Sequence, residues 1–379
     1  MTRGQEDRSP QHKKPGFIQS KLTYTFFVPK HGSSSTTSPY FAKPAADLDP
    51  QDEAMTSDTE ETGTAGATKG VSNINLYTER RSNLNRPPPT LKSSPSSRRS
   101  VMLAHVAAET NAVLPKVLKF IPNAPPKGEL YDPGNLFRLE RGHCPKLPST
   151  RIRVVNSDSI DAALSLSSRT AATSSTPTSK PVLILNMANA YHSGGGWKHG
   201  ALAQEEALCY RSSLSFTLKT RYYPIPEFGG IYSPTVVVIR ENMAQGHDLL
   251  DLSKPDHLPV VSCVSVAAIR GPDIVRDAGG REKYVHKQDR ETMKEKMRVV
   301  LRIAAVRKHR ILILGALGCG AFGNPRTEVV RCWREIFEER EFGGGWWESI
   351  VFAVMEPGEQ KDGDGNFGVF FRGLDGVEV

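Results

Sequence analysis

Two adjacent glutamates, Glu205 and Glu206, are well suited to acid–base chemistry because they follow a glycine-rich loop at a short spacing. Three consecutive glycines, Gly194–Gly196, are separated from Gln204 by seven residues. Glycines without side chains let the backbone approach a ligand closely and turn its N–H groups inward. Carboxylates in a first helical turn can also serve simply to complement the helix dipole. The combination, preceded by Asn189 at the exit of an apolar run, favours a ligand site.

A second glycine-rich segment lies more than 100 residues later. Gly318, Gly320 and Gly323 follow an apolar run and precede a helical pattern, a context in which glycines and a helix N-terminus can cradle a diphosphate. The spacing also matches the dinucleotide fingerprint. That alternative is weakened because the segment falls in the last third of the chain and no acidic residue ends a strand about 20 residues later. A plain turn is the remaining alternative.

These motifs resemble those of a known enzyme family. Three glycines, seven residues and Gln-Glu-Glu are similar to the signature of poly(ADP-ribose) glycohydrolases, and the preceding NMANAYHSGGG resembles the ribose-binding strand and loop of macrodomains. Leu314–Pro325 resembles the phosphate loop of the compact, microbial-type glycohydrolases. The resemblance extends from about Arg99 to Phe371 and implies a macrodomain-like fold. Ser193 departs from it, because a proline commonly precedes the glycine triplet in the family.

The resemblance implies a role for each motif residue. Cleavage of an O-glycosidic ribose–ribose bond needs an acid for the departing oxygen and a base for water, and one glutamate can do both if burial raises its pKa. By the family pattern that residue is Glu206, while Glu205 holds ribose hydroxyls and Asn189 the distal ribose. No metal or cofactor is implied. The other expected substrate contacts are Gly194, Gly195, Gly196, Gln204, Gly318, Cys319, Gly320, Ala321, Phe322 and Asn324.

Asp158 has two possible roles. It follows a short predicted strand, Ile152–Val155, and precedes an apolar segment, so it is well placed to cap a helix. In macrodomains, an acidic residue at such a strand end often contacts the adenine amino group. Capping alone explains its position, so the adenine contact is the secondary expectation.

Two other functions fit the same motifs. A non-catalytic ADP-ribose reader would keep the glycine loops but would not need Gln204, Glu205 and Glu206. A mono-ADP-ribosyl hydrolase acting on protein linkages would use a similar pocket. We expect a glycohydrolase of the compact type that releases ADP-ribose from chain ends, since the segment before residue 98 is too polar to form the helical accessory domain of animal-type enzymes.

Apolar patterning predicts strands that alternate with helices, hence one three-layer α/β/α domain with a mixed sheet over residues 98–379. The predicted strands are 152–155, 181–185, 234–239, 258–268, 311–314 and 349–355. The predicted helices are 101–120, 160–166, 204–219, 282–308 and 327–338. Residues 121–135, 167–180 and 241–257 are predicted to be loops.

Composition limits the possible settings of the protein. The net charge of +8 is divided about equally between residues 1–100 and the remainder, which indicates a mildly basic surface and no nucleic-acid-binding stripe. The five cysteines are scattered without a CxxC pair, which argues for a reducing compartment. The N-terminus lacks a signal-peptide core, and no apolar run is long enough to cross a membrane. We therefore expect an intracellular monomer, in the nucleus or cytoplasm, with poly(ADP-ribose) and ADP-ribosylated proteins as partners.

Residues 1–97 are rich in Ser, Thr, Pro and charged side chains and are predicted to be a disordered tail. One apolar island interrupts them. Gln19, Leu22 and the pair Phe26–Phe27 resemble the short box by which replication and repair proteins dock on the sliding clamp, although the aromatic pair is displaced by one residue. An unassigned apolar patch is the alternative.

Overall fold

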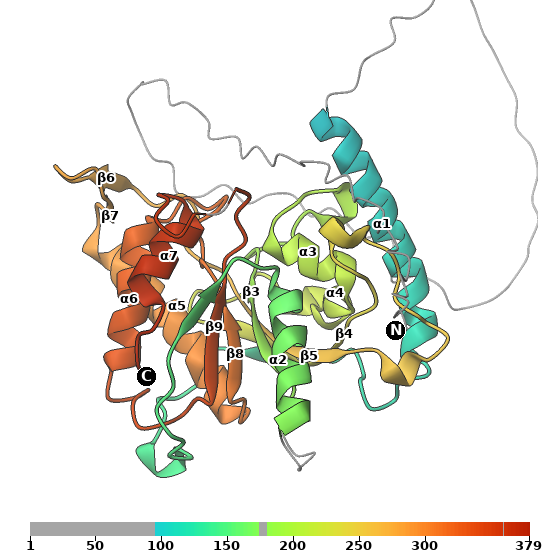
Figure 1. Ribbon diagram of the computed structural model, residues 1–379, viewed down its shortest axis with the longest axis horizontal. Helices are drawn as coiled ribbons and strands as arrows, with labels where there is room; N and C mark the ends of the chain where they lie inside the picture. Colours follow the sequence, from blue (N-terminus) through green and yellow to red (C-terminus); the bar gives the residue numbers. More distant parts are fainter. Residues whose placement is uncertain (1–94, 174–179, 359) are drawn as a thin grey trace, which may run out of the picture. The chain divides into compact units, whose positions relative to one another are not determined.

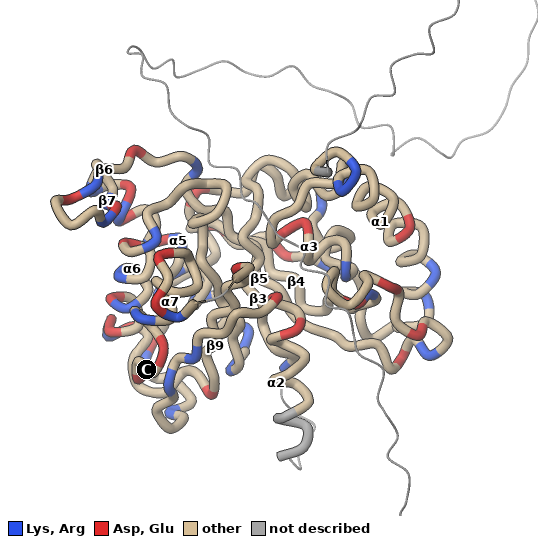
Figure 2. Tube along the Cα trace, turned by 45° about the horizontal axis from the view of Figure 1, so that its top comes forward, with Lys and Arg blue, Asp and Glu red and all other residues tan. Residues whose placement is uncertain are grey.

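The computed structural model describes residues 95–173, 180–358 and 360–379. Residues 1–94 of the predicted tail, with the clamp-like box at Gln19–Phe27, lie outside these residues. Residues 95–97, predicted as the end of the tail, are instead helical. Among the described residues, every helix is too short or too polar to span a lipid bilayer. Lys and Arg residues are scattered along this part of the chain, interspersed with Asp and Glu residues (Figure 2).

A seven-stranded mixed sheet forms the centre of the fold, with the strand order β1-β4-β5-β3-β8-β9-β2. The five strands from β5 to β2 are parallel, whereas β4 is antiparallel to β5 and β1 to β4. The carboxyl ends of the parallel strands therefore meet at one edge of the sheet. The strands are β1 (Glu129–Tyr131), β2 (Arg153–Val155), β3 (Leu183–Met187), β4 (Gly230–Val237), β5 (Val260–Val266), β8 (Ile311–Leu314) and β9 (Ser349–Ala353).

Helices cover both faces of this sheet, which confirms the predicted three-layer arrangement (Figure 1). One face carries α5 (Lys287–Val306), α6 (Arg326–Glu338) and α7 (Asn366–Leu374). The other carries α1 (Pro95–Leu118), α2 (Ser159–Thr173), α3 (Gln204–Arg211) and α4 (Leu214–Thr217).

Strand β3 illustrates how the sequence produces two cores. Leu183 and Leu185 pack in the α5–α7 core, whereas Val182 and Ile184 pack in the α1–α3 core. Successive strand residues point to opposite faces, so a continuous apolar run is what a strand covered on both sides requires. This run fixes β3 at the centre of the sheet.

Several element boundaries differ from the sequence prediction. Residues Glu282–Tyr284 form strand β7, not the first turn of a helix, and pair with β6 (Ile274–Arg276) in a separate hairpin. The helix was predicted to start there because the alternating charges of this segment resemble those of a surface helix. The predicted helix from Gln204 is interrupted after Arg211, because Ser212 is extended and bridges to Val238.

Other differences concern segments predicted as loops. The helix that starts at Ser159 continues to Thr173, so the Ser/Thr-rich segment is partly helical. Strand β1 lies within the predicted loop 121–135, and helix α7 was not predicted. The 3-10 turns Met243–Gln245 and Pro255–His257 interrupt the predicted loop 241–257. Short elements of this kind lack a long periodic pattern, and tertiary packing determines them.

Candidate active site

Glu205 and Glu206 lie in the first turn of α3, and both are buried, with 3% and 8% of their surface exposed. The preceding Gln204 fixes the start of this helix against β3. Its Oε1 accepts a hydrogen bond from the Met187 backbone N–H at 2.9 Å, and its Nε2 donates to the Leu185 carbonyl at 2.8 Å. Both ends of the amide are thus engaged within the protein, so Gln204 anchors α3 in this structure.

The other end of α3 is held by ion pairs. Arg211, which is 2% exposed, pairs with Asp158 and Asp161 of the α2 N-terminal region. Asp158 also accepts a hydrogen bond from the Ile160 N–H at 2.8 Å, which confirms the predicted helix cap. Burial raises the pKa of Asp158, and the Arg211 charge opposes that rise. The adenine contact of Asp158 stays a prediction.

Glu205 faces the end of β3. Its Oε2 accepts a hydrogen bond from the Asn189 backbone N–H at 2.7 Å, and its Oε1 accepts one from Asn186 Nδ2 at 3.2 Å. Burial raises the pKa of Glu205 to about 8, although these hydrogen bonds lower it. The side chain is therefore protonated over much of the neutral pH range.

Asn186 was missed as a site residue at the sequence level. It is fully buried within the apolar run of β3, and its Nδ2 also donates to Ser265 Oγ at 3.0 Å. Its Oδ1 has no hydrogen-bond partner among the described residues. A polar residue inside an apolar strand is the signal that could have identified it. Burying an amide costs free energy unless it is hydrogen-bonded, so such a residue indicates a specific partner.

The glycine loop holds the glutamates, which differs from the expected role of its backbone. The N–H of Gly196 donates to Glu206 Oε1 at 3.0 Å, and the N–H of Gly195 donates to the His192 carbonyl at 3.0 Å. In contrast to the prediction, these two N–H groups are therefore not free to bind ribose. Gly195 has a φ of +60°, and an added Cβ would lie 2.3 Å from Glu206 Oε1.

Asn189 lies just beyond β3 and is partly exposed. Its Oδ1 accepts hydrogen bonds from the backbone N–H groups of Tyr191 and His192, at 2.8 and 3.1 Å. These bonds orient the amide so that Nδ2 is the group left for a ligand hydroxyl. Tyr191 beside it is 68% exposed.

The second glycine segment starts at the end of β8, which neighbours β3 in the sheet. Gly315 lies against Met187: a Cβ added to this glycine would be 3.4 Å from the methionine Cε. The two motifs, separated by more than 100 residues in sequence, therefore meet at the same sheet edge. This is the position where open α/β sheets bind ligands.

The residues of this second loop differ in their accessibility. Gly320 and Ala321 are exposed, Phe322 is partly buried, and Cys319 is 8% exposed. A Cβ added to Gly320 would meet nothing within 4 Å, so ligand atoms can approach its backbone. Helix α6 follows Pro325, which makes no side-chain cap. Within the part of the chain that the structure describes, the first N–H groups of this helix are therefore available to an anion.

Asn324 is engaged within the protein, contrary to its predicted ligand contact. It is 3% exposed, and its Nδ2 donates to the carbonyls of Ile269 and Gly318, at 2.7 and 3.1 Å. Its Oδ1 accepts a hydrogen bond from the Tyr284 hydroxyl at 2.9 Å. Asn324 therefore shapes the loop instead of facing its ligand.

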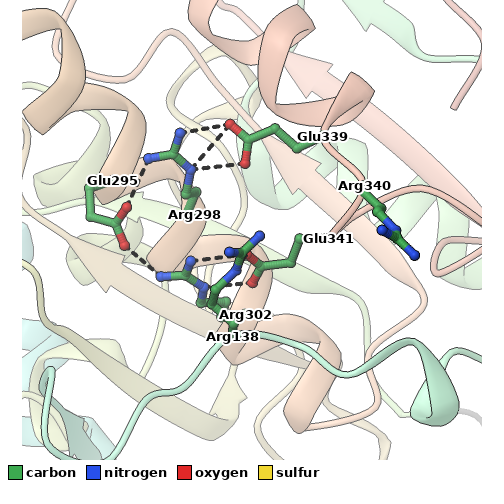
Figure 3. Close-up of a pocket in the computed structure, with 7 residues that line it drawn as sticks. All are labelled: Arg138, Glu295, Arg298, Arg302, Glu339, Arg340 and Glu341. Carbon is green, nitrogen blue, oxygen red and sulfur yellow. Dashed lines mark hydrogen bonds and ion pairs between the residues drawn. The ribbon is translucent and has the colours of Figure 1, made fainter.

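A charged pocket of about 440 Å³ lies elsewhere, where α5 meets the segment after α6 (Figure 3). Arg298 forms hydrogen bonds with both oxygens of Glu339, and Arg302 with both oxygens of Glu341. The three glutamates that line the pocket, Glu295, Glu339 and Glu341, are all paired with arginines, so the pocket is formed mainly by an ion-pair network. Among the residues that the structure describes, no three His, Cys, Asp or Glu side chains are grouped to hold a metal ion.

Residues 123–241 match the family model described as microbial-type PARG, catalytic domain. The structure is similar to poly(ADP-ribose) glycohydrolase from Thermomonospora curvata, with 26% sequence identity and a TM-score of 0.57, over 72% of this chain and 99% of that one. The same enzyme bound to the inhibitor ADP-HPD gives 25% identity and a TM-score of 0.55, with the same coverage.

A mutant of the poly(ADP-ribose) glycohydrolase from Deinococcus radiodurans, in complex with ADP-ribose, is also similar. Its sequence identity is 26% and its TM-score 0.50, over 65% of this chain and 94% of that one. No curated protein sequence matches this chain.

Proposed function

This chain is a microbial-type poly(ADP-ribose) glycohydrolase, and we propose that it releases ADP-ribose by hydrolysing the ribose–ribose O-glycosidic bonds of poly(ADP-ribose). One observation carries the proposal. The buried pair Glu205–Glu206 lies in the first turn of α3, which follows β3, and the exposed Gly320 lies on the loop after β8, the neighbouring parallel strand. Carboxylates for a ribose and backbone groups for a diphosphate are thus brought to one edge of the sheet.

Glu206 is the general acid and base in this proposal. Its carboxyl group protonates the departing ribose oxygen as the oxocarbenium-like state forms, and its carboxylate then takes a proton from the attacking water. The hydrogen bond from Gly196 holds Oε1 in place through both steps. Glu205, protonated near neutral pH, donates a hydrogen bond to a ribose hydroxyl.

The remaining contacts follow from the geometry of the loops. Asn189 Nδ2 binds the distal ribose, because its Oδ1 is already engaged. The backbone around Gly320 and the first turn of α6 bind the diphosphate, with Phe322 beside it. We further propose that the enzyme works from chain ends. Its five cysteines are free thiols, which fits an intracellular site of action.

Incubation of the purified protein with purified poly(ADP-ribose) tests the proposal, with chromatography to quantify free ADP-ribose. The expected product is ADP-ribose that accumulates until the polymer is consumed. Binding of the polymer without product would instead identify a reader, and release of ADP-ribose only from mono-ADP-ribosylated protein would identify the alternative hydrolase.

A further inference from the structure

The β6–β7 hairpin is attached to the candidate phosphate loop at its base. It leaves the sheet after β5, extends away from the body of the protein, and returns to start α5 (Figure 1). The Gly271 N–H, at the outgoing end, donates to the Phe322 carbonyl at 2.8 Å. At the returning end, the Tyr284 hydroxyl donates to Asn324 Oδ1 at 2.9 Å.

Asn324 links the hairpin to the phosphate loop through hydrogen bonds. Its Nδ2 donates to Gly318 and Ile269 carbonyls, and its backbone N–H donates to the Gly318 carbonyl at 3.0 Å. Gly318 has a φ of +75°, and a Cβ there would lie 2.5 Å from Asn324 Nδ2. The amide therefore fits closely into the turn that begins the loop.

Tyr284 holds the oxygen of that amide by a hydrogen bond. An asparagine side chain can rotate by 180° with little change in shape, which would exchange its donor and acceptor. The carbonyls of Ile269 and Gly318 only accept hydrogen bonds and so require Nδ2 on their side. This leaves Oδ1 to accept the hydrogen bond from the hydroxyl of Tyr284, a residue that is 9% exposed. Burial raises the pKa of Tyr284, so the hydroxyl keeps its proton for donation.

We propose that Tyr284 is a positioning residue of the active site, acting through Asn324 to hold the phosphate loop in the shape that binds the ADP-ribose diphosphate. The hairpin is then part of the substrate-binding machinery. This inference rests on the proposed function for the identity of the ligand, but not for the coupling between hairpin and loop.

The test compares Tyr284→Phe with Tyr232→Phe. Tyr232 is a matched control, because it too is a buried tyrosine with a hydrogen-bonded hydroxyl. It is 3% exposed, and its hydroxyl is hydrogen-bonded to His309 Nε2 at 2.8 Å. His309 precedes β8, so this hydrogen bond is made to the amino-terminal end of that strand, whereas the phosphate loop follows its carboxyl end. Both variants lose one buried hydrogen bond, and only one of them loses it at the phosphate loop.

For Tyr284→Phe, we expect the Kd for ADP-ribose and the KM for polymer to rise by about threefold to tenfold, with kcat nearly unchanged. Tyr232→Phe should leave all three at wild-type values. Equal effects of the two substitutions on Kd and KM would overturn the inference, because they would reflect general destabilisation.

Hydrogen exchange of the ligand-free proteins gives a readout that does not depend on the proposed function. The backbone N–H of Asn324 should exchange faster in Tyr284→Phe than in wild type. In Tyr232→Phe it should exchange at the wild-type rate. An unchanged rate in Tyr284→Phe would overturn the inference. A wild-type protein that binds no ADP-ribose would refute the proposed function alone, since the exchange comparison would still decide whether the coupling exists.

Discussion

The backbone N–H of Gly196 donates a hydrogen bond of 3.0 Å to Oε1 of Glu206, ten positions later in the chain. The glycine loop and the first turn of α3 are therefore one unit, and the loop conformation sets the position of the carboxylate. The N–H of Gly196 thus binds a carboxyl group of the protein itself.

Replacing Gly195 by alanine tests this unit. The new Cβ would lie 2.3 Å from Glu206 Oε1, so we expect the carboxylate to be displaced and kcat to fall at least about tenfold. The positive φ alone costs about 1–2 kcal/mol of stability. Gly376→Ala is the matched control, because its φ is +79° and its Cβ would meet nothing within 4 Å. Equal kcat values for the two variants would show that this contact is unimportant.

Stability should depend on pH through Glu205. Burial raises its folded-state pKa from 4.5 to about 8, so the folded protein holds this proton more tightly than the unfolded chain. That stabilisation is fully present below pH 4.5 and is lost as the pH rises through 8. Relative to wild type, Glu205→Gln should gain on the order of 4 kcal/mol in free energy of unfolding between pH 4.5 and 8. Urea unfolding of both proteins at both pH values checks this. If the free energy of unfolding changed with pH by the same amount in wild type and Glu205→Gln, the prediction would be contradicted.

Glu341 should give the opposite pH dependence. Burial alone would raise its pKa, but hydrogen bonds from Arg302 and the Leu139 N–H outweigh burial and lower it. Its contribution is therefore present above the unfolded value of 4.5 and lost as the pH falls through the lower, folded value. Glu341→Gln should cost about 1–3 kcal/mol at pH 7, with a smaller loss under acid conditions. A cost that is constant down to pH 3 in urea titrations would disprove this.

The sequence was sufficient to predict the layers, the central strands and the position of the glutamate pair. Strands β3 and β5 could be predicted because each is a continuous apolar run, the pattern expected of a strand that is covered on both faces. The hydrogen-bond partners of Gln204, Gly196 and Asn324 were not predictable. Each partner depends on which backbone groups tertiary packing brings within about 3 Å, and sequence spacing carries no such information.

A substitution at Gly320 should separate ligand binding from folding. Its backbone has no positive φ, and an added Cβ meets open space, so Gly320→Val should change the free energy of unfolding by less than about 0.5 kcal/mol. The branched side chain would, however, block close approach of a diphosphate. We expect the Kd for ADP-ribose to rise at least about tenfold by calorimetry. An unchanged Kd would mean that the diphosphate binds elsewhere.

The most direct test of the proposed chemistry is the rate at which Glu206→Gln releases ADP-ribose from purified poly(ADP-ribose), relative to wild type. The amide can neither protonate the departing oxygen nor activate water, while it can still accept the Gly196 hydrogen bond. We predict a rate lower by about 10²–10⁴-fold, with ADP-ribose binding retained in calorimetry. A variant that binds ADP-ribose and keeps more than about a tenth of the wild-type rate would contradict the assignment of Glu206 as the acid and base.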